Sequence, residues 1–200
     1  MDPKAQGKYH HGDLRRALIE SAIGAIDEVG PHTFSLRALA HDLNVSHAAA
    51  YRHFRNKDDL LVAVAIEGLK RLAAELVKAA EGSEQPAATL QQGALAYMRF
   101  GLDNPGLYQV MFSGITQRNE TSRAAADGVM AMTAQLVVRA QQAGSVLEDD
   151  PYQQARAAWA MLHGLIDLEQ RKQFGERERE EVMSHAEAIL LAFLKGLSSA

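Results

Sequence analysis

Apolar residues recur at spacings of three and four along most of the chain, which is the period of an amphipathic α-helix. The first such stretch is expected to form a helix whose inward face carries Leu14, Leu18, Ala22, Ile26 and Val29. Asp13 stands just ahead of this face as the expected N-cap. Gly30-Pro31 is expected to end the helix, because glycine adopts the left-handed cap conformation and proline cannot continue a helix.

Two short helices and one long helix are expected next. Ser35 and Ser46 each precede a short periodic run and are expected to cap it, and Asn44 interrupts the chain between the two runs. Lys57 lies at the start of a much longer run that reaches about residue 80. The natural boundary therefore falls near Lys57, with residues 1–57 as one domain and residues 58–200 as the other.

The rest of the chain repeats the helical pattern. We expect helices over residues 87–103, 107–112, 124–143, 152–172 and 178–197. Polar breaks separate these stretches, and several of them contain glycine or proline. No β alternation and no internal repeat is found, so the sequence predicts an all-α protein of about nine helices.

Composition bounds the class of protein. Of the 200 residues, 47% are hydrophobic and none is cysteine, which excludes a mostly disordered chain, disulfides and cysteine-ligated zinc. No apolar run approaches the roughly 18 residues of a membrane span, and no secretory signal follows Met1, so a cytoplasmic protein is expected. Residues 1–57 hold 8 Lys and Arg against 6 Asp and Glu, whereas the whole chain has a net charge of −4. This asymmetry favours contact between the N-terminal domain and a polyanion.

Residues 35–54 carry the clearest functional signal, because they fit helix, tight turn and helix into a short span. Asn44 lies at the turn, where a positive φ is needed and asparagine tolerates it. A short helix with a small residue such as Ala48 at its tip enters a DNA major groove, which is about 12 Å wide. Lys57 adds a positive charge at the start of the next helix. The residues expected to contact DNA are Ser35, Arg37, Ser46, His47, Ala48, Tyr51, Arg52, His53 and Lys57.

This segment resembles the N-terminal domain of TetR-type transcriptional regulators. The resemblance covers roughly residues 10–65 and rests on matches in fixed spacing, among them Arg15-Arg16-Ala17-Leu18-Ile19, Phe34-Ser35-Leu36-Arg37, Val45-Ser46 and Tyr51-Arg52-His53-Phe54. It implies an all-helical homodimer whose N-terminal helix-turn-helix binds operator DNA and whose C-terminal domain binds a small effector and dimerises. It also implies that the recognition helix runs from Ser46 to Phe54.

The C-terminal part has a second, shorter resemblance. Asn104-Pro105-Gly106-Leu107-Tyr108, Met111-Phe112 and Trp159-Ala160-Met161-Leu162-His163-Gly164-Leu165 resemble the C-terminal domain subfamily named for its Trp…His-Gly motif. This resemblance implies a class of regulator and does not indicate a ligand.

Aromatic residues and methionines of the C-terminal domain are candidates for an effector pocket, since ligand sites are mostly apolar with a few polar groups. These residues can equally be ordinary core, and His163 can be a polar anchor or a satisfied core histidine. His163 and Asp167 would also suit a metal or a catalytic base, but a third partner is lacking, so no metal, cofactor or catalytic set is expected. The pocket candidates are Tyr97, Met98, Phe100, Tyr108, Met111, Phe112, Trp159, Met161 and His163.

The last two expected helices carry apolar residues on more than one stripe, and the core of one protomer uses only one face of a helix. The additional apolar surface predicts a four-helix interface between two copies of the chain. The alternative is that these helices are fully buried within one protomer. The residues expected at this interface are Leu162, Ile166, Ala186, Ile189, Leu190 and Phe193.

The sequence thus predicts a homodimeric, ligand-responsive transcriptional regulator, a repressor that binds a pseudo-palindromic operator. The alternative is a helical small-molecule-binding protein or enzyme that retains the helix-turn-helix. The segment Lys4, Lys8, Tyr9 and His10 is a further candidate for contact with the DNA backbone, and His10-His11 could instead be a metal site or a solvated pair.

Overall fold

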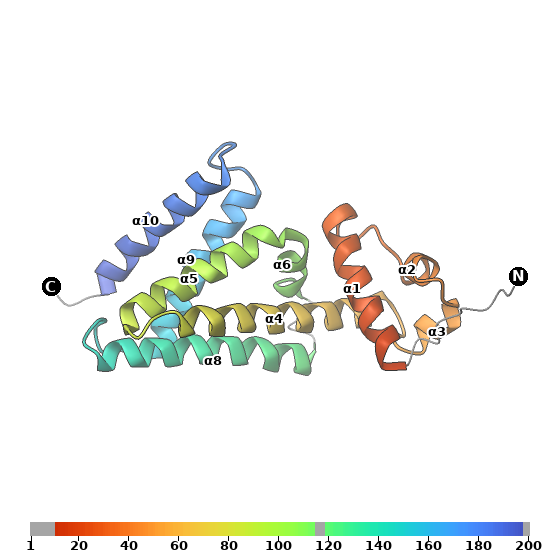
Figure 1. Ribbon diagram of the computed structural model, residues 1–200, viewed down its shortest axis with the longest axis horizontal. Coiled ribbons are helices and arrows are strands. Elements are labelled where there is room, and N and C mark those ends of the chain that lie inside the picture. The colour runs from red at the N-terminus through yellow and green to blue at the C-terminus, as the bar shows by residue number, and fades with distance from the viewer. Residues whose placement is uncertain (1–10, 115–118, 198–200) are drawn as a thin grey trace, which may run out of the picture.

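The computed structural model describes residues 11–114 and 119–197, and every regular element in these ranges is a helix (Figure 1). The predicted all-α class is therefore confirmed. The helices are α1 (His11–Val29), α2 (Leu36–Asp42), α3 (His47–Tyr51), α4 (Lys57–Glu81), α5 (Pro86–Asp103), α6 (Pro105–Met111), α8 (Glu120–Gln142), α9 (Pro151–Gln170) and α10 (Arg179–Leu197). The candidate segment from Lys4 to His10 lies outside the described residues.

Side-chain caps fix where the helices near the N-terminus begin. The Ser35 hydroxyl accepts a hydrogen bond from the Ala38 amide at 3.1 Å, and the Ser46 hydroxyl accepts one from the Ala49 amide at 3.2 Å. These bonds satisfy backbone donors that a helix start leaves unpaired. The prediction that Asp13 caps the first helix was wrong, because α1 already begins at His11.

Two details of the N-terminal helices also differ from expectation. The predicted helix from Ser46 to Phe54 is shorter, since α3 ends at Tyr51 and the chain then turns so that Phe54 is only 3% exposed. Val29 was expected on the buried face of α1, but it is 51% exposed because it is the last residue of the helix.

Helix α4 runs through most of the length of the molecule and links its two ends (Figure 1). Its first turns bury Leu60 and Leu61 in the same core cluster as residues of α1 and α3. Further along, Leu69 and Leu72 pack on the C-terminal helices, within the same cluster. The expected boundary at residues 57 and 58 coincides with the start of α4, a helix that serves both domains.

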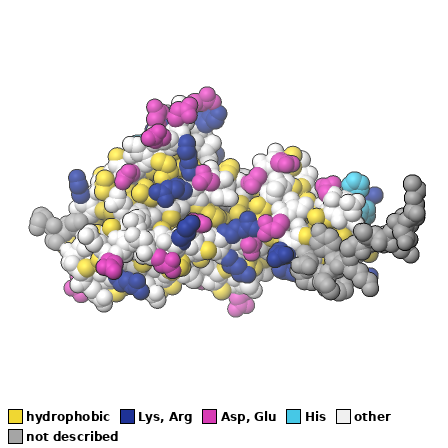
Figure 2. Space-filling model, in the orientation of Figure 1, with side chains coloured by type: hydrophobic (Ala, Val, Ile, Leu, Met, Phe, Trp, Pro, Cys, Tyr) yellow, Lys and Arg dark blue, Asp and Glu magenta, His cyan; other side chains and the backbone are white. Residues whose placement is uncertain are grey.

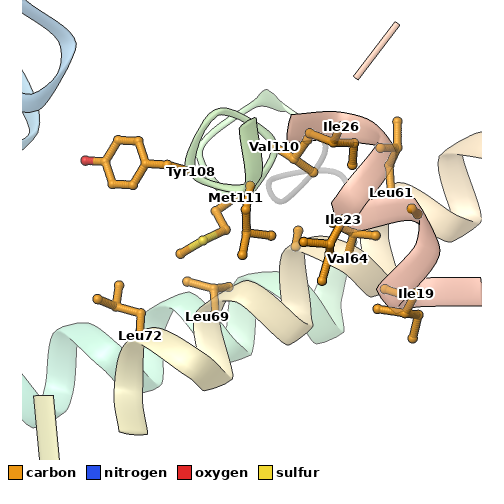
Figure 3. Packing of buried hydrophobic residues seen from close by; sticks show 14 of the residues in the cluster. Ile19, Ile23, Ile26, Leu61, Val64, Leu69, Leu72, Tyr108, Val110 and Met111 are labelled. Carbon is orange, nitrogen blue, oxygen red and sulfur yellow. The ribbon is translucent and has the colours of Figure 1, made fainter. Parts of the chain in front are cut away.

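Helix α6 is wedged between α1 and α4 at the junction of the two domains (Figure 3). Two glycines allow this close approach. A Cβ atom on Gly106 would lie 2.7 Å from Ile26 Cγ2 of α1, and one on Gly68 of α4 would lie 2.6 Å from Met111 Sδ. Contacts below about 3 Å cannot be accommodated without movement of packed atoms, so the absent side chains let three helices meet.

Most of the residues predicted at a dimer interface lie inside the protomer. Leu162, Ile166, Ala186 and Leu190 are each at most 5% exposed, and Ile189 and Phe193 are half-buried. The apolar stripe chosen from the sequence is thus the one that faces α5 and the protein interior, so the prediction was wrong for the four buried residues. None of the described helices combines the length and apolar character needed to cross a membrane.

Candidate DNA-binding surface and effector cavity

Helices α2 and α3 form a compact helix-turn-helix held by their inward residues. Asn44, at the turn, has a φ of +53°, in the left-handed region that asparagine adopts more readily than most residues. The Val45 amide donates to the Ala40 carbonyl oxygen at 2.9 Å, which closes the end of α2. Leu39, Ala40 and Ala50 are buried, so the two helices are locked to each other and to α1.

The outer surface of this unit carries most of the residues predicted to contact DNA. Tyr51 is 49% exposed, a large value for an aromatic side chain. His53 is half-buried and is the least accessible of the outward candidates on α3 and its C-terminal turn. Figure 2 shows histidine side chains gathered at this end of the molecule. The other exposed candidates are Ser35, Arg37, Ser46, His47, Ala48 and Arg52.

Lys57, which is predicted to contact DNA, also makes contacts within the protein. Its Nζ atom donates hydrogen bonds to the carbonyl oxygens of His32 at 2.9 Å and Phe34 at 2.8 Å, and it lies 4.4 Å from the centre of the Phe34 ring. Two of the three ammonium protons are therefore used to hold the loop between α1 and α2 against the start of α4. The expected contact of Lys57 with DNA stays a prediction.

A cavity of about 1020 Å³ lies among the C-terminal helices. Such a volume is at the upper end of the range for small-molecule sites. Its wall is mainly aliphatic, and the charged residues that line it, Arg123, Asp127 and Arg156, are exposed and so lie at its rim. Helix α4 contributes Leu69 and Leu72, so the same helix that supports the DNA-binding unit also lines the cavity.

The predicted pocket residues divide into two groups. Tyr97, Phe112, Trp159 and His163 line the cavity. Met98, Phe100 and Met111 do not, because they are buried core residues packed between helices. Tyr108 is also buried and stands directly behind the wall, and Met161 packs half-buried against the core.

One wall of the cavity contains a chain of hydrogen bonds between ring side chains, which we call the aromatic relay (Tyr97, Tyr108 and His163). The Tyr97 and Tyr108 hydroxyl oxygens are 3.0 Å apart, and the Tyr108 hydroxyl is 2.6 Å from His163 Nδ1. The Trp159 ring packs beside His163, with the ring centres 5.2 Å apart. The relay therefore joins α5, α6 and α9 through polar contacts in a mainly apolar environment.

The protonation states in the relay follow from burial. Burial raises the pKa of Tyr97 to about 12, with the hydrogen bond to Tyr108 opposing the shift. Burial also raises the pKa of Tyr108, and the neighbouring Tyr97 and Asp167 add to the effect. Burial lowers the pKa of His163, against the smaller opposing effect of the Asp167 carboxylate. At neutral pH, both phenols are protonated and His163 is neutral.

The pairing of His163 with Asp167 does not extend to a metal-type cluster. The Asp167 carboxylate accepts hydrogen bonds from Arg171 Nε, with both oxygen atoms at 2.8 Å. Over the described residues, no group of three or more histidine, aspartate or glutamate side chains could hold a metal ion.

Sequence reasoning missed the aliphatic half of the cavity. The buried Leu162 and Leu190 were assigned to a dimer interface but line the cavity instead, the half-buried Phe193 also lines it, and Leu76 and Met130 were not named as pocket candidates. Periodicity shows that these residues are on an apolar stripe, but a cavity wall and a packed core have the same pattern.

The comparisons with known proteins agree with this arrangement. Residues 18–64 match the family model described as bacterial regulatory proteins, tetR family, and residues 90–193 match the model described as tetracyclin repressor-like, C-terminal domain. The two matches cover the helix-turn-helix and most of the cavity-bearing helices, and the second alone spans more than half of the chain. The protein belongs to the TetR family of transcriptional regulators.

Individual relatives extend the likeness over nearly the whole chain. The chain is 24% identical over 186 residues to the uncharacterized HTH-type transcriptional regulator YobS of Bacillus subtilis (strain 168), covering 93% of each protein. It is 39% identical over 72 residues to the HTH-type nicotine-responsive transcriptional repressor HdnoR of Paenarthrobacter nicotinovorans, covering 36% of this chain and 37% of that protein. A solved structure of a protein of unknown function from Rhodococcus sp. RHA1 is 32% identical, with a TM-score of 0.85 over 97% of this chain and 100% of the other.

Proposed function

We propose that this TetR-family protein is a homodimeric, ligand-responsive repressor that binds a pseudo-palindromic operator. The observation that carries the proposal is the helix-turn-helix of α2 and α3, which presents Arg37, Tyr51 and Arg52 on its exposed surface. The guanidinium groups suit guanine edges or phosphates, and the Tyr51 hydroxyl suits phosphates. The half-buried His53 is proposed to make at most a peripheral contact with the DNA backbone.

The proposed dimer uses the outward faces of α9 and α10. Leu168 of α9 and Leu191 of α10 are each 40% exposed, although both are large apolar residues. Two copies related by a two-fold axis would cover these side chains in a four-helix interface. Such a dimer would place two α3 helices about one turn of DNA apart, roughly 34–36 Å, as a pseudo-palindrome requires.

The proposed effector site is the cavity, and two elements connect it to the DNA-binding unit. Helix α4 runs from the cavity to the DNA-binding unit, so we propose that it acts as a lever between the two. Helix α6 adds a second route, because Tyr108 belongs to the relay while Gly106 abuts Ile26 of α1. Figure 3 shows Tyr108 projecting to one side of α6 and Val110 to the side of Ile26. An effector that favours one arrangement of α4 and α6 would change the separation of the two DNA-binding units in the dimer.

Two finer assignments belong to the same proposal. The motif Trp159…His163-Gly164 supports placing the C-terminal domain in the subfamily named for it, since Trp159 and His163 both line the cavity and pack ring to ring. A regulator of chromosomal genes would act in the cytoplasm, where it can reach its operator.

The decisive experiment is selection of bound fragments from the source genome by the purified full-length protein, followed by gel-shift titration of the selected and random DNA. We expect a pseudo-palindromic sequence bound at least about 10³-fold more tightly than random DNA. Equal affinity for both would reject a specific regulator in favour of a nonspecific binding protein. An assay for turnover of hydrolysable substrates would distinguish a regulator, which should show none, from an enzyme that retains the helix-turn-helix.

A further inference from the structure

Histidines are concentrated in the DNA-binding unit (Figure 2). Four of the eight histidines of the chain, His32, His41, His47 and His53, lie between residues 30 and 57, the stretch that contains α2, α3 and the loops beside them. The same stretch holds four Lys and Arg residues and one acidic residue. Its net charge is therefore +3 when the four histidines are neutral and +7 when all four are protonated. The charge of this surface can thus more than double across the pH range in which histidine titrates.

Two of these histidines are exposed and have no partner within the described part of the protein. His47 is the first residue of α3, and His32 lies in the loop between α1 and α2. Over residues 11–114 and 119–197, neither imidazole makes a hydrogen bond or an ion pair. By contrast, His41 Nδ1 lies 3.3 Å from the Asp42 carboxylate, and His53 is half-buried. His32 and His47 are therefore the two imidazoles of this unit that can pair with an external anion at the least cost.

The loop that carries His32 is fixed next to predicted DNA contacts. Lys57 Nζ donates to the His32 carbonyl oxygen at 2.9 Å and to that of Phe34 at 2.8 Å. Ser35, which is also expected to contact DNA, follows three residues after His32 and caps α2. His32 was not among the residues predicted from the sequence to contact DNA, because its loop meets Lys57 only in the folded chain. A DNA backbone that reaches Lys57 and Ser35 passes close to His32.

The neighbouring acidic groups do not occupy either imidazole. Two carboxylates near the histidines are already paired, Glu20 with Arg71 and Asp59 with Arg55. The other charged or titratable side chains of α1 to α3, their loops and the first turn of α4, over residues 14–60, are Arg15, Arg16, Asp27, Glu28, Arg37, His41, Asp42, Tyr51, Arg52, His53, Lys57 and Asp58. None of them forms a hydrogen bond or an ion pair with the side chain of His32 or His47.

A phosphate favours the protonated form of a nearby imidazole. The ordinary pKa of histidine is about 6.5, so an exposed imidazole gains most of its charge between pH 8 and pH 6. Duplex DNA carries one negative charge per roughly 1.7 Å of its axis and stabilises a cation placed against it. Docking on DNA therefore takes up protons at any such histidine. By linkage, a reaction that takes up protons becomes more favourable as the pH falls.

We propose that His32 and His47 contact the phosphate backbone of bound DNA in their protonated form, and that DNA binding therefore tightens as the pH falls from 8 to 6. This inference rests on the proposed DNA-binding function. It adds a phosphate contact, His32, that lies outside the two short helices, and it makes the DNA affinity respond to pH. Because the contacts are to the backbone, they act on DNA of any sequence.

The test uses DNA of random sequence, so it does not require the operator to be known. A fluorescently labelled duplex of about 30 base pairs, roughly three helical turns, is titrated with the full-length protein at pH 6 and at pH 8 at one ionic strength. Fluorescence anisotropy measures the affinity. We expect at least about tenfold tighter binding at pH 6, and a slope of log affinity against log salt that is steeper there by about one unit or more. Equal affinity at the two pH values overturns the inference.

Variants assign the pH dependence to the two side chains. The double variant His32→Gln/His47→Gln should bind as the wild type does at pH 8, where few imidazoles are charged, and should gain less than about threefold at pH 6. A purely structural role would weaken binding at both pH values. His185→Gln in α10 is the matched control, because glutamine still offers an acceptor to Arg177 Nη1, and it should keep the wild-type pH dependence. A double variant that keeps the wild-type gain, or that is weakened equally at both pH values, contradicts the assignment.

The outcome is separable from that of the proposed function. If random DNA is bound with the same affinity at both pH values, only the histidine contacts are wrong, and the selection of an operator is unaffected. If the duplex is not bound at either pH in low salt, the proposed DNA-binding function fails and the inference fails with it. Circular dichroism at both pH values verifies that each protein is folded during the titration.

Discussion

The Tyr108 hydroxyl lies 2.6 Å from His163 Nδ1, which ties α6 to α9 across the wall of the cavity. Two residues before Tyr108, Gly106 packs against α1 of the DNA-binding unit. One short helix therefore hydrogen-bonds to a cavity-lining residue through Tyr108 and packs against the DNA-binding unit at Gly106. A substitution in α6 is therefore expected to change the affinity of the protein for DNA, which can be measured.

The arginines on the exposed surface of the helix-turn-helix are expected to contribute to operator recognition. Arg37→Ala or Arg52→Ala should each weaken specific binding by about 1–3 kcal/mol if the side chain contacts a guanine, with less effect on random DNA. Gel-shift titration measures both affinities. Arg139→Ala, which removes an exposed arginine in the last turn of α8, is the matched control and should bind as the wild type does. Wild-type affinity in the two head variants would reject the role in recognition.

Lys57 is expected to act on both stability and DNA affinity. Lys57→Ala removes charge-assisted hydrogen bonds to the carbonyl oxygens of His32 and Phe34 and should lower the free energy of unfolding by about 1–3 kcal/mol. Loss of one phosphate contact should also reduce the slope of log affinity against log salt by about one unit. Lys70→Ala, at an exposed site further along α4, should change neither quantity. An unchanged slope with lowered stability would leave Lys57 with its loop contact alone.

The junction between α6 and α1 should not tolerate a side chain at Gly106. In Gly106→Ala the new methyl group would lie 2.7 Å from Ile26 Cγ2 and 2.9 Å from the Ile26 carbonyl oxygen, and the backbone atom cannot rotate away. We expect a loss of about 1–3 kcal/mol in unfolding free energy together with altered operator affinity. Gly128→Ala meets no atom within 4 Å in α8 and should stabilise the protein by about 0.5–1 kcal/mol. Chemical denaturation measures both, and equal effects would refute the close packing.

The proposed dimer should depend on the exposed leucines. Leu191→Glu places a charge on the outward face of α10 and should weaken self-association by at least about 100-fold, which sedimentation over a concentration series measures. Val77→Glu changes a residue of α4 that is 46% exposed and should leave the dimer intact. A stable dimer in Leu191→Glu would place the interface elsewhere.

The burial of His163 predicts a pH dependence of stability. Because burial lowers the pKa of His163 below its ordinary value of 6.5, the unfolded chain binds a proton in a pH range where the folded protein does not. The free energy of unfolding should therefore fall as the pH decreases below about 6.5 and level off below the folded pKa. The His163→Gln variant should lack this component, so the difference between the wild-type and variant profiles should change with pH over this range. A wild-type profile that runs parallel to that of the variant between pH 7 and pH 5 would contradict the assigned shift.

The order of the helices was accessible from the sequence because it depends on local chemistry. The caps at Ser35 and Ser46 and the turn at Asn44 are set by interactions within a few residues, and the structure has all three. The α1 start was missed, since helix ends are set by small energy differences that neighbouring packing can shift by a few residues.

What the sequence by itself determined is therefore the helical class, the helix-turn-helix and the family resemblance. Only the tertiary structure decided which apolar stripe faces a cavity, which faces the core and which faces solvent. Leu190 and Leu191 are adjacent in one helix, yet Leu190 is 2% exposed and lines the cavity, while Leu191 is 40% exposed. The reason is that the helical period fixes which residues share a face, whereas the partner of that face depends on contacts with helices far away in the sequence.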